Sequence, residues 1–160
     1  MVILGIDPGT ARLGYGIIKE KGKTGLSLVI SGVFVTAKES QLQDRLLYLY
    51  ENLLELITKY SPDVIVVERI FFNTNAKTAI AVGQARGVIL LSAARTKTRI
   101  HEYTALEAKL VLTGYGRSDK KVMQEAVKNI LELDAIVKSD DANDAVAMAL
   151  CYVKKGESKK

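Results

Sequence analysis

The sequence is poor in residues that crosslink or interrupt a chain, because its 160 residues include one cysteine and two prolines. The single cysteine, Cys151, excludes a disulfide framework within the chain and favours a reducing compartment. No apolar run reaches the length of a membrane span, since Arg86 and Arg95 flank VILLSAA. With 48% hydrophobic residues and so little proline, the composition indicates one compact domain. We therefore expect a soluble, cytoplasmic protein with a single domain at 1–153 and a basic, disordered tail at 154–160.

Charge is distributed unevenly along the chain, whose formal net charge is +5. Between Arg95 and Lys128, eight lysines and arginines stand against four acids, and the C-terminal KKGESKK adds four lysines. A basic half beside clustered acids is typical of a protein that handles a polyanion through metal ions. An ordinary solvated surface explains the same charges equally well, so charge alone does not decide between the two.

The periodicity of apolar residues predicts an alternation of strands and helices. The strands are expected at 2–7, 13–20, 26–35, 63–68 and 98–103. The helices are expected at 40–60 with Ser40 as N-cap, at 75–95, from the last strand to 112, at 119–132 and at 141–153. Three strands joined by hairpins and followed by alternating helices and strands indicate an α/β fold, a five-stranded mixed sheet flanked by helices.

Four acids are placed where the fold could bring them together. Asp7 and Glu68 each end an apolar strand, and parallel neighbouring strands would carry both carboxylates to the same sheet edge. In DDANDAVAMAL, Asp141 and Asp144 stand three residues apart and so share a helix face. Helix capping explains one aspartate of this segment but not several. Four converging carboxylates would repel one another unless divalent cations lay between them, and two such metals form a clamp for displacement at a phosphodiester.

Five segments carry a resemblance that spans essentially the whole chain: GIDPGTARLGYGII, VVERIFF, GQARGVIL, EYTALEAKLVLTGYGRSDKKVM and DDANDAVAMAL. Together they resemble the RuvC family of Holliday junction resolvases. The resemblance implies the ribonuclease H-like fold and a homodimer that nicks opposed strands of a four-way DNA junction in recombination and repair. It also implies two Mg²⁺ or Mn²⁺ ions per active site, products with a 5′ phosphate and a 3′ hydroxyl, and RuvA and RuvB as partners.

The same resemblance assigns roles to individual residues. It makes catalytic metal ligands of Asp7, Glu68, Asp141 and Asp144. Phe71 corresponds to the family's aromatic at the junction crossover, although a core position is the alternative. Lys109 and Lys120 correspond to basic residues near the scissile phosphate, with Lys121 one register away. Arg69 follows the catalytic glutamate, where many members have a neutral polar residue, and would add a phosphate contact.

The final motif, Asp-x-x-Asp-Ala, leaves Asp140 as the expected helix cap. The only histidine, His101, precedes Glu-Tyr inside a strand, and we interpret it as structural. In the helix at 75–95, Gly83 and Gly87 lie four apart among alanines, which favours close approach of another backbone. We expect this helix at or beside the dimer interface, while packing on the chain's own sheet is the alternative.

Other functions share parts of this pattern. DPGT also matches the phosphate turn of actin-like and sugar-kinase phosphotransferases, but those enzymes need two such domains and this length predicts one. A non-catalytic junction-binding module would have no use for four acids, which weaken DNA binding unless metals use them. A single-domain nuclease acting on RNA shares the fold but lacks these lysine and phenylalanine segments.

Overall fold

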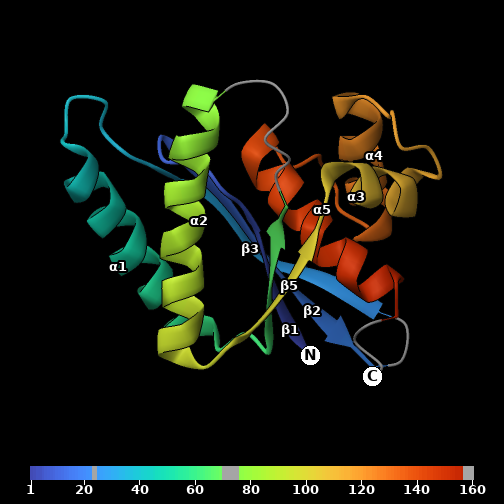
Figure 1. The fold of residues 1–160 in the computed structure, drawn as a ribbon. Helices are drawn as coiled ribbons and strands as arrows, with labels where there is room; N and C mark the ends of the chain where they lie inside the picture. Colours follow the sequence, from blue (N-terminus) through green and yellow to red (C-terminus); the bar gives the residue numbers. More distant parts are fainter. Residues whose placement is uncertain (23–24, 70–75, 157–160) are drawn as a thin grey trace.

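The computed structural model describes residues 1–22, 25–69 and 76–156, in which strands and helices follow the predicted order (Figure 1). The strands are β1 (Val2–Asp7), β2 (Arg12–Lys21), β3 (Gly25–Val35), β4 (Val64–Glu68) and β5 (Arg99–Tyr103). The helices are α1 (Leu42–Tyr60), α2 (Ala76–Thr96), α3 (Ala105–Thr113), α4 (Lys120–Ile130) and α5 (Asp140–Lys154). None of the described helices is long and apolar enough to cross a membrane.

The five strands form one mixed sheet in the order β3-β2-β1-β4-β5. The first three strands are antiparallel neighbours, whereas β4 pairs in parallel with both β1 and β5. Because Ile6 lies opposite Val67, the next residues along the two strands, Asp7 and Glu68, leave the sheet side by side. The expected meeting of these two acids at the carboxyl edge of parallel strands is confirmed.

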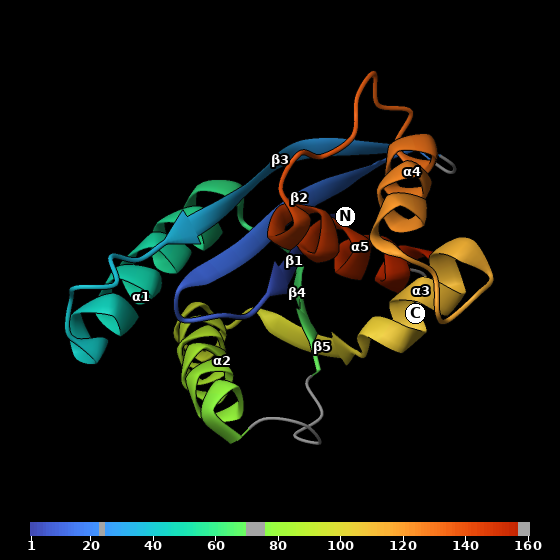
Figure 2. The ribbon, with the colours of Figure 1, turned by 90° about the horizontal axis from the view of Figure 1, so that it is seen from above.

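Helices cover both faces of the sheet, α1 and α2 on one face and α3, α4 and α5 on the other (Figures 1 and 2). Alternate residues of each strand point to opposite faces, so each face has its own core. Leu4 packs in the core beneath α1 and α2, while its neighbour Ile3 packs in the core beneath α5. Because the helices cover the faces of the sheet, the ends of the central strands can hold functional residues.

Glycines on β1 and β2 let α5 lie almost against the backbone of the sheet. A Cβ atom at Gly5 would overlap the carbonyl oxygen of Ala145, and one at Gly14 would overlap that of Asp141. A Cβ at Gly16 would collide with Val146 in the same way. The small residues of α5 and these glycines therefore fix the depth of the helix, which in turn fixes where its aspartates stand.

Two predicted helix caps are wrong, and both errors have a local cause. Ser40 does not cap α1, because its backbone N–H closes the preceding turn onto Ala37 and Gln41 takes the N-cap position. Asp140 does not cap α5, because Ser139 occupies that position and Asp140 is the first helical residue. The helix continues to Lys154, one residue beyond the helix end expected at 153, and Lys155 contacts Glu107. Residues 157–160 of the expected tail lie outside the described residues.

Candidate active site

Asp7 and Glu68 form the centre of the site at the ends of β1 and β4. Burial, followed by the charges of Glu68, Asp144 and Asp141, raises the pKa of Asp7 to about 8. The protonated Asp7 carboxyl donates a hydrogen bond to Glu68, whose own pKa is raised by burial and by the charge of Asp144. At neutral pH the two carboxyls therefore share a proton in the absence of another cation.

The first turns of α5 bring two further acids to the same place. Asp144 is partly buried, and burial followed by the negative charge of Asp140 raises its pKa. Asp141 is near enough to contribute to the raised pKa values of both Asp7 and Asp144. Asp7 is thus within electrostatic reach of the other three predicted acids, although the four come from three separate elements.

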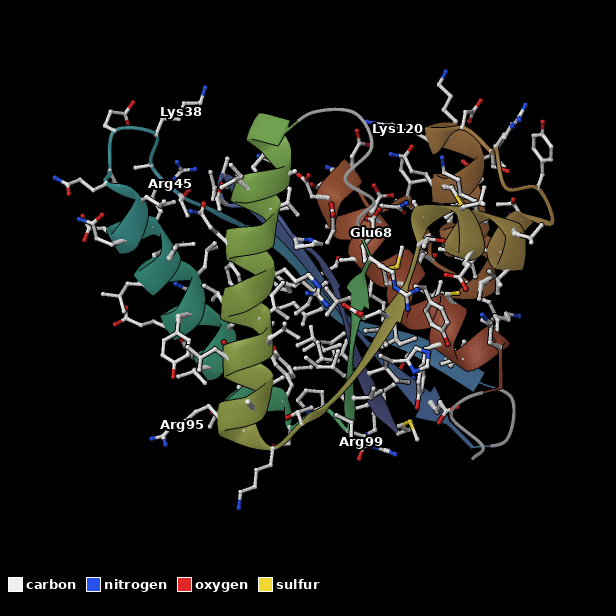
Figure 3. The ribbon with its side chains drawn as sticks, viewed as in Figure 1. Lys38, Arg45, Glu68, Arg95, Arg99 and Lys120 are labelled. Carbon is white, nitrogen blue, oxygen red and sulfur yellow. The ribbon has the colours of Figure 1, made fainter. Side chains whose placement is uncertain are left out.

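Two lysines stand beside these acids around a cavity of about 140 Å³. The cavity is lined by Glu68 and Asp144, by Lys109 and Lys120, and by apolar side chains of α3, α4 and α5. Lys121 is not among the lining residues, so the geometry favours the register that selects Lys120. Figure 3 shows Glu68 and Lys120 toward one end of the molecule, whereas Arg95 and Arg99 lie at the opposite end.

Asp140 holds one of these lysines in place. Its Oδ2 accepts from Nζ of Lys120 at 2.8 Å, and its Oδ1 accepts from Nε2 of Gln124 at 3.1 Å. The ion pair raises the pKa of Lys120, which is fully charged at neutral pH. The first aspartate of DDANDAVAMAL therefore tethers α4 to α5, a contact across 20 residues that no local pattern could have revealed.

Arg12 is a second contact that motif analysis missed. Its Nε donates to Oδ2 of Asp141 at 2.7 Å, and its Nη2 approaches Oγ of Ser139 at 3.5 Å. The sequence signal was present, because Arg12 opens the strand that follows the DPGT turn. Only the tertiary fold shows which acid it meets.

Arg69 lies at the rim of the site and not at its centre. Its backbone N–H donates to the carbonyl of Tyr103 at 2.7 Å, and its Nε lies 3.9 Å from Glu102. Glu102 is held more tightly by Arg86 of α2, whose Nη2 lies 2.6 Å from Oε1. The half-exposed guanidinium of Arg69 remains accessible to a polyanion, while Phe71 lies outside the described residues.

The donor set suits a hard divalent cation, since the four candidate ligands offer only carboxylate oxygens. Burial and the neighbouring acids together raise the pKa of Asp7 to about 8, and a bound cation would offset both by favouring the ionised carboxylate. In the described part of the chain no three acidic, histidine or cysteine side chains form a preassembled metal-binding group. Asp141 is instead paired with Arg12.

The sheet order, the helices on both faces and the acids at the carboxyl edge define a nuclease of the ribonuclease H-like fold. The profile of the family described as "Crossover junction endodeoxyribonuclease RuvC" matches residues 3–152. The chain therefore belongs to the RuvC family of crossover junction endodeoxyribonucleases, whose members are metal-dependent. Both the predicted family and the predicted fold are confirmed.

Individual relatives agree with this assignment. The RuvC protein of Caldicellulosiruptor saccharolyticus is 45% identical over 153 residues, which cover 96% of this chain and 92% of the relative. That of Thermosipho melanesiensis is 47% identical over 151 residues, covering 94% and 96%. Among solved structures, Thermus thermophilus RuvC in complex with a Holliday junction substrate superposes with a TM-score of 0.93 at 28% identity, covering 99% of this chain and 96% of that one.

Proposed function

We propose that the protein is a Holliday junction resolvase, an endonuclease that makes paired, symmetric nicks in four-way DNA junctions during recombination and repair. One observation carries the proposal beyond family membership. Four acids from β1, β4 and α5 meet beside two lysines, and burial together with the charges of the neighbouring acids raises the pKa of Asp7 to about 8. Such a cluster disfavours phosphate unless cations are present, and with cations it becomes a phosphodiester-cleaving site.

The four acids are the ligands in this proposal. Asp7, Glu68, Asp141 and Asp144 would hold two Mg²⁺ or Mn²⁺ ions, which supply Lewis-acid activation of the attacking water and of the leaving 3′ oxygen. Asp7 must lose its shared proton to become a ligand, so metal loading and deprotonation are linked. The products are a 5′ phosphate and a 3′ hydroxyl.

The basic residues hold the substrate. Lys109 and Lys120 line the cavity next to Glu68 and Asp144, where they offset negative charge on the scissile phosphate. Their contacts position DNA without reading its sequence. We assign Arg69 to a phosphate contact at the rim, and Phe71 to stacking at the junction crossover by family resemblance.

We further propose that the enzyme is a homodimer formed through α2. Two opposed nicks require two sites related by symmetry. One face of α2 is left open by the chain's own fold, with Ile80 and Leu91 66% and 59% exposed. On the same face a Cβ at Gly83 or Gly87 would meet no other atom, so these glycines do not pack on the sheet of their own chain. This small, apolar stripe at helical spacing suits a second copy of the helix.

The remaining assignments follow from the family. RuvA and RuvB are the proposed branch-migration partners, and the proposed compartment is the cytoplasm. The single cysteine, Cys151, is buried and suits a reducing compartment.

The experiment that tests the assignment of the acids separates binding from cleavage. Asp7→Asn and Asp141→Asn should each abolish Mg²⁺-dependent cleavage, because each variant removes a proposed metal ligand. Four-way junction binding in EDTA should survive in both variants and tighten in Asp141→Asn, which removes a negative charge from the phosphate-binding surface. Lys38, which Figure 3 shows far from Glu68, offers a control variant, Lys38→Gln, that should cleave normally. Loss of junction affinity in parallel with cleavage, in folded acid variants, would contradict the assignment.

A further inference from the structure

Arg12 places a permanent positive charge on one of the proposed metal ligands. It stands at the start of β2, 129 positions before Asp141, yet its Nε lies 2.7 Å from the Oδ2 atom of that carboxylate. Nη2 of the same guanidinium donates to Oγ of Ser139 at 3.5 Å, so Arg12 contacts two residues at the N-terminal end of α5. The two paired side chains are 51% and 29% exposed, which is too open for the pair to be a core element of the fold.

We propose that Arg12 is an internal counter-cation of Asp141, which leaves that carboxylate when a divalent metal ion binds and thereby sets the metal concentration the enzyme requires. The proposal rests on the proposed function of Asp141 as a metal ligand. Arg12 is a positioning residue in this account, because it acts on the metal through Asp141.

Two physical facts support an exchange. An arginine guanidinium keeps its charge across the whole range in which proteins are stable, so it competes for a carboxylate oxygen at every working pH. A unit positive charge at hydrogen-bond distance from a ligand also repels a divalent cation on the same carboxylate, and this repulsion acts through a partly solvated, moderately screened space. Both effects lower the affinity for metal, and neither requires a change in fold.

The opposite possibility is that Arg12 orients Asp141 and so strengthens metal binding. The structure favours exchange because the guanidinium already occupies Oδ2 of Asp141, an oxygen that a metal ion on this carboxylate would need. Removing the guanidinium leaves an unpaired charge on Asp141 beside other acids, and a metal ion is the cation best able to compensate it. The two possibilities predict changes of opposite sign.

The test is a titration of the DNA-free protein with Mn²⁺ alone, in which binding is measured by calorimetry and by the rise in Tm. Arg12→Gln removes the charge but keeps a hydrogen-bond donor, and we expect it to bind Mn²⁺ about 3- to 10-fold more tightly than the unchanged protein. Arg12→Lys keeps the charge and should stay within about twofold of the unchanged protein. Arg95→Gln, which removes an equal charge at the far end of α2, should change nothing (Figure 3).

Equal or weaker Mn²⁺ binding by Arg12→Gln overturns the proposal, as does Arg12→Lys binding as tightly as Arg12→Gln. Circular dichroism in EDTA verifies that each variant is folded, and Arg12→Ala, which also removes the charge and should also bind Mn²⁺ more tightly, carries the test should Arg12→Gln fail to fold. Asp7→Asn separates this inference from the proposed function. If the unchanged protein binds no Mn²⁺, or Asp7→Asn binds it normally, both fall, whereas loss in Asp7→Asn without a gain in Arg12→Gln overturns the role of Arg12 alone.

Discussion

Replacing Asp7 by asparagine should make the metal-free protein more stable, even though it removes a proposed catalytic group. The pKa of Asp7 is raised from 3.8 to about 8, chiefly by burial and by the neighbouring acids. The folded state therefore binds a proton that the unfolded state releases, and stability falls as the pH rises from 3.8 through about 8. Asparagine carries no charge and its amide can still donate to Glu68, so it imitates the protonated aspartate without this loss.

The size of the effect follows from the same pKa values. Each pH unit between the two pKa values costs about 1.4 kcal/mol, which sets an upper limit of about 4 kcal/mol at pH 7. Partial exposure of the site reduces this, and we expect a gain on the order of 2–4 kcal/mol at pH 7–8. For a domain of this size, that gain corresponds to a rise in Tm of roughly 5–15 °C.

Thermal unfolding in EDTA, measured at pH 8 and at pH 5, tests this expectation. The difference in Tm between Asp7→Asn and the unchanged protein should be large at pH 8 and smaller at pH 5, where the unfolded state is closer to its own pKa. Asp44→Asn, in the exposed first turn of α1, is the matched control and should shift Tm little at either pH. Added Mn²⁺ should stabilise the unchanged protein but not Asp7→Asn. A variant that is no more stable than the unchanged protein at pH 8, or equally favoured at both pH values, would refute the reasoning.

Three further substitutions probe separate parts of the account. Gly5→Ala should lower stability by about 1–3 kcal/mol in denaturant unfolding and strongly reduce cleavage. The added Cβ would push Ala145, and with it the aspartates of α5, away from β1. Unchanged activity would contradict the close fit of α5 to β1. Asp140→Asn should leave the exposed Lys120 untethered, so that cleavage falls while Tm changes little. An activity equal to that of the unchanged protein would show that the tether is dispensable. Gly87→Glu should dissociate the proposed dimer in analytical ultracentrifugation without unfolding the monomer, whereas Gly87→Ala should remain a dimer. A dimeric Gly87→Glu protein would show that the interface does not include this face of α2.

The parts of the fold governed by local patterns could be predicted from the sequence. The apolar run before Asp7 and the one before Glu68 are short, and each ends in an acid at a turn, so both strands and their functional ends were visible. The pairing of these strands in parallel then followed from the order of helices and strands. The meeting of Asp7 and Glu68 is thus a consequence that sequence reasoning could reach.

The contacts that complete the site depend on distances that no local pattern encodes. Aspartate is a residue type favoured at helix N-caps, so local preference alone predicted that Asp140 caps α5. Its actual partner, Lys120, lies 20 positions away. Gly14 and Gly16 are unfavourable in a strand interior, so the sequence gives no reason for them in β2. The reason is the close approach of α5, which leaves no room for a Cβ atom at either position. Arg12 lies inside the segment GIDPGTARLGYGII, but the motif assigns it no role, and only the folded chain reveals that it meets Asp141.

The central claim is that this chain cuts both opposed strands of a four-way junction at symmetric positions. The most direct measurement is a strand-specific cleavage assay on a synthetic mobile junction with Mg²⁺, in which each strand is labelled in turn and the protein is at micromolar concentration. The account predicts nicks at matching positions on two opposed strands, made within one encounter, with 5′ phosphate and 3′ hydroxyl ends that a ligase can rejoin. Cleavage of a single strand per encounter, equal cutting of linear duplex, or resolution by a protein that sediments as a monomer would contradict it.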